Sequence, residues 1–194
     1  MKGTFKSETH QYFIDGVEIY SNTQILKLAG LIDDRWYTDH GKDRGHAVHL
    51  GCQLLDEESL DWASLDLEIE PYVIAYERFK RESGFIPDII EVPFYNYPHR
   101  YGTTIDRTGP MNGRKILLEL KSGAVEPWCA LQLALQNECL PQRLPKFALQ
   151  LKSDGTYQLH EFKDPNDRNV ALAAVAIVHW KENQGEIYAN RNAA

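Results

Sequence analysis

The sequence contains few cysteines, and they are widely spaced. Its three cysteines are Cys52, Cys129 and Cys139, and no two of them form a CxxC pair. Zinc ribbons and dithiol redox sites depend on such pairs, so the sequence argues against both kinds of site. We therefore expect the three thiols to be small buried hydrophobic groups.

A long apolar run and an excess of positive charge are also missing. No apolar run approaches the roughly 20 residues needed to span a bilayer. The N-terminus lacks a signal-peptide pattern, so we expect a cytoplasmic protein with no membrane partner. The formal net charge of −7 argues against a general nucleic-acid binder, which is usually basic. A local basic face or a bound metal ion could still supply the positive charge that a nucleic acid requires.

The remaining composition is that of an ordinary globular domain. The 194 residues are 43% hydrophobic and 25% charged, and they contain no internal repeat or low-complexity segment. This length is sufficient to bury a full core. We expect a single domain over residues 1–194, in which about 183–194 form a flexible tail.

Turn dipeptides and hydrophobic periodicity predict alternating strands and helices. Asp-Gly dipeptides predict hairpins over 5–20 and 146–163, and a β-prone run predicts strand structure over 86–97. A loop is expected over 33–45. Helices are expected over 24–29, 44–55, 64–83, 125–140 and 164–181. This order predicts an α/β fold, with a mixed central β-sheet flanked by α-helices on both faces and an N-terminal β-hairpin.

Residues 101–123, YGTTIDRTGPMNGRKILLELKSG, carry the strongest chemical pattern. Gly-Pro and Asn-Gly dipeptides separate two β-prone runs, so we expect a hairpin whose first strand ends at Asp106. The second strand carries Glu119 and Lys121, which are two residues apart and therefore share a face. If the hairpin closes, Asp106 lies beside Glu119, and two carboxylates and one ammonium group converge.

Carboxylate oxygens are ligands that suit Mg²⁺ or Mn²⁺. A lysine beside the metal ion can orient or deprotonate a water molecule, or stabilise negative charge in a transition state. A surface hairpin with one weak Glu–Lys ion pair is the structural alternative. An isolated Glu-x-Lys pattern is compatible with both interpretations.

The same segment resembles the bipartite motif of the PD-(D/E)XK nuclease superfamily. Asp106, a turn-containing spacer and then Glu119-Leu120-Lys121 match that motif, although Ile105 stands where the superfamily's name has proline. The strings GTTIDR, LELKSG and QLALQ together are similar to the RecB-like and phage exonuclease branch. The resemblance covers most of the chain, from about Tyr12 to His179, and implies a restriction-endonuclease-like core.

The resemblance extends to the flanking segments. Arg44-Gly-x-x-Val-His49 matches a RecB-like motif whose histidine joins the metal site, which makes His49 a ligand candidate. Gln132 matches a glutamine that lies near the DNA, whereas Gln136 stands where tyrosine is usual, and two solvent-facing glutamines are the alternative. Glu91 resembles an acidic residue that precedes the aspartate strand, but it is equally consistent with an edge-strand charge.

This resemblance implies a metal-dependent deoxyribonuclease that uses one or two Mg²⁺ or Mn²⁺ ions. The implied metal ligands are His49, Asp106, Glu119 and the carbonyl oxygen of Leu120. Lys121 would position the attacking water while the metal ion polarises the phosphate. The implied catalytic residues are Lys121, Asp106, Glu119 and Gln132. Some relatives hold an iron–sulfur cluster with four cysteines, and we expect none here because the chain has three.

Family precedent favours a phage-type exonuclease that acts on DNA ends during recombination or repair in the host cytoplasm. A recombination or single-strand-binding protein and further copies of the chain are candidate partners. Two alternatives stay open: a structure-specific endonuclease, and a catalytically inactive module of the same fold that binds nucleic acid or a partner. A glycosidase acid/base pair is disfavoured by the lysine that follows Glu119.

Overall fold

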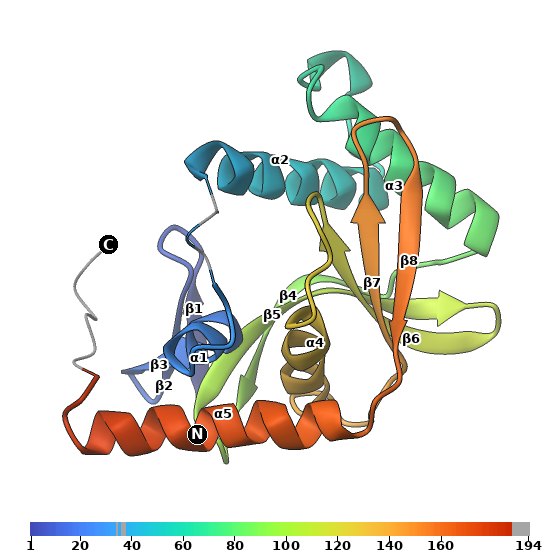
Figure 1. The fold of residues 1–194 in the computed structure, drawn as a ribbon. Coiled ribbons are helices and arrows are strands. Elements are labelled where there is room, and N and C mark those ends of the chain that lie inside the picture. Colours follow the sequence, from blue (N-terminus) through green and yellow to red (C-terminus); the bar gives the residue numbers. More distant parts are fainter. Residues whose placement is uncertain (34, 36–37, 188–194) are drawn as a thin grey trace.

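The computed structural model describes residues 1–33, 35 and 38–187. Within these residues, eight strands form one mixed sheet (Figure 1). The strand order is β1-β2-β3-β5-β6-β7-β8, and β4 pairs with β5 off this path. The β3–β5 and β6–β7 pairs are parallel and the other pairs are antiparallel. The predicted mixed α/β architecture is therefore confirmed.

The N-terminal strands are β1 (Gly3–Lys6), β2 (Gln11–Ile14) and β3 (Val17–Ser21). The predicted hairpin turn is confirmed between β2 and β3, where Asp15 and Gly16 both have positive φ angles, of 51° and 78°. Helix α1 (Asn22–Leu28) follows at once, because Ser21 and Gln24 form a reciprocal capping box at its start.

The next two helices differ from the prediction in where they begin. Helix α2 (Asp39–Asp56) starts within the predicted loop, because the Thr38 side chain caps it by accepting a hydrogen bond from Gly41 N. Residues 34, 36 and 37 of that loop lie outside the described residues. Helix α3 (Glu70–Ser83) begins six residues later than expected, after the 3₁₀ turn η1 (Trp62–Ser64). Its first turn contains proline, which has no N–H to leave unpaired there.

The predicted central hairpin is present, but its first strand is longer than expected. The strands are β4 (Ile89–Asn96), β5 (Tyr101–Met111) and β6 (Arg114–Lys121). The prediction that the strand ends at Asp106 is wrong, because β5 continues to a turn at Asn112 and Gly113. Pro110 does not break the strand. It pairs with Lys115 next to the two-residue turn, at a pair that needs no hydrogen bond from its nitrogen.

The C-terminal part of the chain follows the predicted order. Helix α4 (Cys129–Asn137) is shorter than the expected helix, and the β7 (Lys146–Leu151) and β8 (Tyr157–Phe162) hairpin is confirmed. Helix α5 (Asn166–Asn183) then runs along one side of the molecule (Figure 1). Of the three thiols predicted to be buried, Cys52 and Cys129 are buried and Cys139 is partly exposed.

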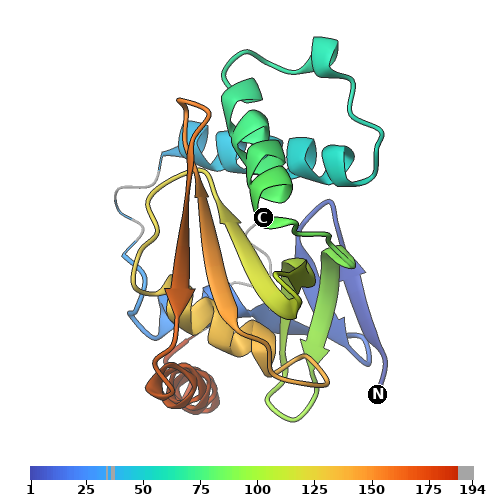
Figure 2. The ribbon, with the colours of Figure 1, turned by 90° about the vertical axis from the view of Figure 1, so that its right-hand side faces the viewer.

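Helices cover both faces of the sheet, so the core has two main parts. Helices α2 and α3 lie on one face, and α1, α4 and α5 lie on the other (Figures 1 and 2). The first part packs Val48 and Tyr76 against Leu118 and Leu149 of the sheet. The second part packs α1, α4 and α5 against the start of β5 at Tyr101. No helix within the described ranges is both long enough and apolar enough to cross a membrane.

Candidate metal centre

The candidate site lies where β5 and β6 stop pairing. The last pair of the ladder joins Arg107 to Leu118, so the next residues, Asp106 and Glu119, stand where the strands part. There the Leu120 backbone N–H donates to Asp106 Oδ2 at 2.7 Å, in place of a backbone acceptor. The Asp106 side chain is thus fixed between the two strands, and only 6% of the residue is exposed.

His49 reaches this point from helix α2. Its Nε2 lies 3.2 Å from the carbonyl oxygen of Leu120, and its Nδ1 lies 3.0 Å from Glu91 Oε1 and 3.8 Å from Asp106 Oδ2. The structure therefore brings together three of the predicted metal ligands: His49, Asp106 and the Leu120 carbonyl. Both imidazole nitrogens face oxygen acceptors, which favours a doubly protonated ring.

Glu91 completes this group, although the sequence left its role open. One ligand atom from each of His49, Glu91 and Asp106 can be chosen so that all three lie within 4.8 Å of one another. Glu91 lies between Ile90 and Val92, which pair with Arg107 and Ile105 on either side of Asp106, and its backbone φ is 49°. Such a left-handed residue within a strand costs about 1–3 kcal/mol and persists only where its surroundings hold it. No sequence pattern signals this backbone conformation, so its position could not be foreseen.

Glu119 belongs to an adjoining group of donors. Its Oε1 accepts from Lys121 Nζ at 2.8 Å and from Gln132 Nε2 at 2.7 Å, and its Oε2 accepts from Gln136 Nε2 at 2.7 Å. Glu119 is only 3% exposed. The predicted residues Glu119, Lys121 and Gln132 therefore lie together, directly beside the His49–Glu91–Asp106 group.

Gln136 is a residue whose role the sequence left open. The interpretation of the two glutamines as solvent-facing is wrong, because Gln132 is 8% exposed and Gln136 is 0% exposed. Gln136 also donates to the Thr104 carbonyl at 3.2 Å, so its amide joins β5 to the Glu119 carboxylate. The spacing of Gln132 and Gln136 by one helical turn was the available signal.

Lys121 is held on three sides. Its Nζ contacts Glu119 Oε1 and lies 3.1 Å from Gln132 Oε1, which accepts from it. The ammonium group also stands 5.0 Å from the ring centroid of Trp128, at the start of α4. The Lys121 side chain keeps 18% of its surface exposed, so the group can still be reached from solvent.

The carboxylates of the site favour positively charged groups beside them. Burial, followed by the negative charge of Glu119, raises the pKa of Asp106 to about 8. Burial opposes the charged form of His49, but the carboxylates of Asp106 and Glu91 outweigh it and raise the pKa of His49 to about 9. Burial likewise opposes the charge of Lys121, but Glu119 holds the pKa of Lys121 above its ordinary value. Carboxylates gathered at low exposure thus stabilise cations around them.

The donor set fits a hard divalent cation. Carboxylate oxygens, one backbone carbonyl and one imidazole suit Mg²⁺ or Mn²⁺, and the absence of thiolate from this set disfavours softer metals. Like-charge repulsion between Asp106 and Glu119 would be relieved by such an ion. We conclude that the residues present could hold a divalent metal ion.

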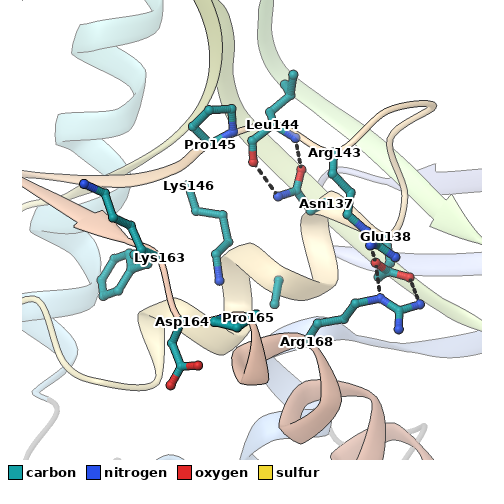
Figure 3. Close-up of a pocket in the computed structure, with 12 residues that line it drawn as sticks. Asn137, Glu138, Arg143, Leu144, Pro145, Lys146, Lys163, Asp164, Pro165 and Arg168 are labelled. Atoms are coloured by element: carbon teal, nitrogen blue, oxygen red, sulfur yellow. Dashed lines mark hydrogen bonds and ion pairs between the residues drawn. The ribbon is translucent and has the colours of Figure 1, made fainter.

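A cavity of about 290 Å³ lies elsewhere, between the end of α4, the start of α5 and the β7–β8 hairpin (Figure 3). None of the candidate site residues lines it. Its cationic side chains have acidic partners: Arg143 and Arg168 both pair with Glu138, and Lys146 pairs with Asp167. These pairs link the end of α4 to β7 and α5, and none of them involves a candidate site residue.

Comparison with solved structures identifies a shared fold. The chain resembles the crystal structure of a protein from Eubacterium rectale, provisionally named an exonuclease, with a TM-score of 0.52. The two share 14% sequence identity, and the match covers 84% of this chain and 74% of that one. An alkaline exonuclease from Laribacter hongkongensis matches at a TM-score of 0.40 and 16% identity, over 87% and 93% of the two chains, which is too low for a conclusion about fold. No family model and no curated protein sequence matches the chain.

Proposed function

We propose that this chain is a divalent-metal-dependent nuclease of the PD-(D/E)XK type. The observation that carries the proposal is the convergence of His49, Glu91 and Asp106 at the parting of two strands, with Lys121 beside Glu119. Carboxylates, an imidazole and an ammonium group in one partly exposed cluster are suited to phosphodiester hydrolysis. The shared fold with a protein named as an exonuclease supports the same class of activity.

His49, Asp106, Glu119 and the Leu120 carbonyl are the proposed metal ligands, and Glu91 joins them as a ligand candidate from the geometry. A bound Mg²⁺ or Mn²⁺ would polarise the scissile phosphate and lower the pKa of a bound water. The neighbouring amides of Gln132 and Gln136 hold the Glu119 carboxylate in one orientation. Hydrogen bonds of this kind fix the orientation of a carboxylate that binds a metal ion.

Lys121 acts in this proposal as a fixed ammonium group. Because Glu119 holds its pKa above the ordinary value, Lys121 is protonated at neutral pH. It can donate a hydrogen bond to the attacking water and stabilise negative charge on the phosphate. Gln132 accepts from Lys121 and donates to Glu119, so it sets the direction in which the ammonium group points.

DNA is the proposed substrate, and an end-dependent exonuclease of phage type, acting in recombination or repair, is the proposed form of the activity. The net charge of −7 means that the DNA must be attracted locally, by the metal ion and nearby basic side chains. A cleavage assay on different nucleic acids decides whether DNA is the substrate and whether cleavage requires a DNA end.

The test is a time course on end-labelled linear and covalently closed double-stranded DNA, with Mg²⁺, Mn²⁺ or EDTA. We expect loss of linear DNA that requires the metal ion, and a rate at least about 100-fold lower for Glu119→Gln protein, because a key oxygen of the site is replaced. Glu161→Gln on β8 is the matched control, since Glu161 pairs only with exposed Lys163 among its described contacts. This control should cleave as the wild type does.

Loss of closed circles at a similar rate would make the protein an endonuclease. Cleavage of neither DNA nor RNA by protein that binds the metal ion would contradict the proposal and favour a catalytically inactive binding module. Equal rates for Glu119→Gln and wild-type protein would place the chemistry at another site.

A further inference from the structure

A buried arginine lies directly behind the candidate metal centre. Arg107 follows Asp106 on β5 and is 0% exposed. Its Nη1 donates to Glu91 Oε1 at 2.9 Å and to the Asp106 carbonyl at 2.6 Å. The same guanidinium donates from Nε to Asp56 Oδ2 at 2.7 Å. One side chain therefore holds the Glu91 carboxylate, the Asp106 peptide and a second carboxylate at once.

Asp56 ties this arginine to the helix that carries His49. It is the last residue of α2, and its side chain is completely buried. The carboxylate also accepts from the Tyr76 hydroxyl at 2.9 Å and from Lys80 Nζ at 2.6 Å, both from α3. Asp56 is thus a fixed anchor, and the end of α2 cannot shift without breaking these contacts.

The contacts form a closed loop. Asp56 contacts Arg107, Arg107 contacts Glu91, and Glu91 contacts His49, which lies seven residues, about two turns, before Asp56 on α2. Each of the three elements that supply the His49–Glu91–Asp106 group is therefore attached to the same guanidinium. A shift of Arg107 would move Glu91 directly and His49 through it.

The planar shape of the arginine side chain allows it to contact Asp56 and Glu91 at the same time. Its planar fork presents Nε toward Asp56 and Nη1 toward Glu91, which a single ammonium group cannot do. Its remaining nitrogen, Nη2, is buried without a hydrogen-bond partner among the described residues. The guanidinium faces the Tyr76 ring at 5.8 Å from the centroid. The guanidinium therefore contacts both carboxylates through Nε and Nη1, while both N–H groups of Nη2 have no partner among the described residues.

We propose that Arg107 is a positioning residue that sets the location of the Glu91 and His49 ligand atoms. The inference rests on the proposed function, because it assumes that these atoms bind a divalent ion. Arg107 does not touch the substrate or the metal ion in this proposal. It acts by holding a carboxylate whose backbone is in an unfavourable left-handed conformation, with φ of 49°.

The test measures Mn²⁺ affinity directly, by titration followed with the electron paramagnetic resonance signal of free Mn²⁺, in the absence of nucleic acid. Arg107→Lys keeps the positive charge but loses the fork. We expect its Mn²⁺ affinity to fall by about 10-fold or more, as is typical when a group supporting a ligand is removed. Lys80→Met is the matched control, because Lys80 contacts Asp56 but not Glu91. Its affinity should stay within about twofold of wild type.

Thermal unfolding of each protein separates positioning from stability. A purely structural role predicts lower melting temperatures for both variants with unchanged Mn²⁺ affinity, and that result would overturn the inference. If Arg107→Lys does not fold, Asp56→Asn decides instead: we expect weaker Mn²⁺ binding than in Lys80→Met, and equal binding would overturn the inference. Wild-type protein that binds no Mn²⁺ would overturn the proposed metal site and, with it, this role of Arg107.

Discussion

At the scale of single residues, the Glu119 carboxylate shows how closely the site depends on helix α4. Both of its oxygens are buried, and α4 supplies a donor to each of them, from Gln132 and Gln136. A buried oxygen left without a donor costs about 1–3 kcal/mol. The packing of α4 and the geometry of the site are therefore coupled through these two amides.

We expect Gln136→Met to lower the free energy of unfolding by about 1–3 kcal/mol, because Glu119 Oε2 loses its donor while the side-chain volume is nearly kept. Urea denaturation measures the change. Gln158→Met on β8 is the control, since Gln158 is exposed, and its effect should stay within about 0.5 kcal/mol. Gln136→Met protein as stable as wild type would contradict the interpretation that this amide supports Glu119.

The sequence predicted which residues of β6 share a face better than it predicted every residue that joins the cluster. Strand alternation was enough to place Glu119 and Lys121 on one face, away from Leu118 and Leu120, and these leucines do lie in the core. The role of Glu91 depends on a single backbone angle, which tertiary contacts hold. The burial of Gln136 depends on how α4 packs on the sheet. The left-handed backbone of Glu91 has no local sequence signal, and the one-turn spacing of Gln132 and Gln136 indicates only a shared helix face, not its burial.

At the scale of elements, the position of α2 depends on its close approach to α3. Gly51 lies two residues after His49, and a Cβ atom added to it would lie 2.8 Å from Val73 Cγ2. Real Cβ atoms do not approach so closely, so the glycine allows the two helices to touch where α2 presents His49 to the sheet. In contrast, a Cβ at Gly45 of the same helix would lie 3.8 Å from Ser122 Oγ, an ordinary contact.

We expect opposite effects from the same substitution at these two positions. Gly51→Ala should destabilise the protein by about 1–3 kcal/mol, because overpacking forces the helices apart. Gly45→Ala should stabilise it by up to about 1 kcal/mol, because alanine favours a helix. Chemical denaturation of both variants gives the comparison. A stabilising Gly51→Ala would mean that α2 and α3 are not packed as closely as described.

Local signals were sufficient for most elements and insufficient for their ends. Asp-Gly and Asn-Gly dipeptides predicted the hairpins, since these residues tolerate the positive φ angles found at both positions of Asp15-Gly16 and Asn112-Gly113 and at Gly155. The start of α2 was missed because two glycines suggested a loop, whereas the Thr38 cap begins the helix before them. The length of β5 was missed because Gly109-Pro110 resembles a turn, although Pro110 stands where its nitrogen has no bond to lose.

At the scale of the whole molecule, the fold collects the site from distant parts of the sequence. His49 comes from α2, Glu91 from β4, Asp106 from β5, and Glu119 and Lys121 from β6. The order of elements predicted a mixed sheet covered on both faces, but which helix meets the parting strands follows only from the three-dimensional packing. A divalent ion at this point would link α2 to the centre of the sheet, so it would stabilise the folded protein.

The central claim is that this cluster hydrolyses phosphodiester bonds with a metal ion and Lys121. The most direct test compares single-turnover hydrolysis of linear double-stranded DNA by wild-type and Lys121→Met protein at the same Mn²⁺ occupancy, established from the rise in melting temperature. We expect Mn²⁺ to stabilise both proteins, while the hydrolysis rate of the variant falls at least about 100-fold, because the ammonium group acts on the reaction. Equal rates for two proteins that both bind Mn²⁺ would contradict the account.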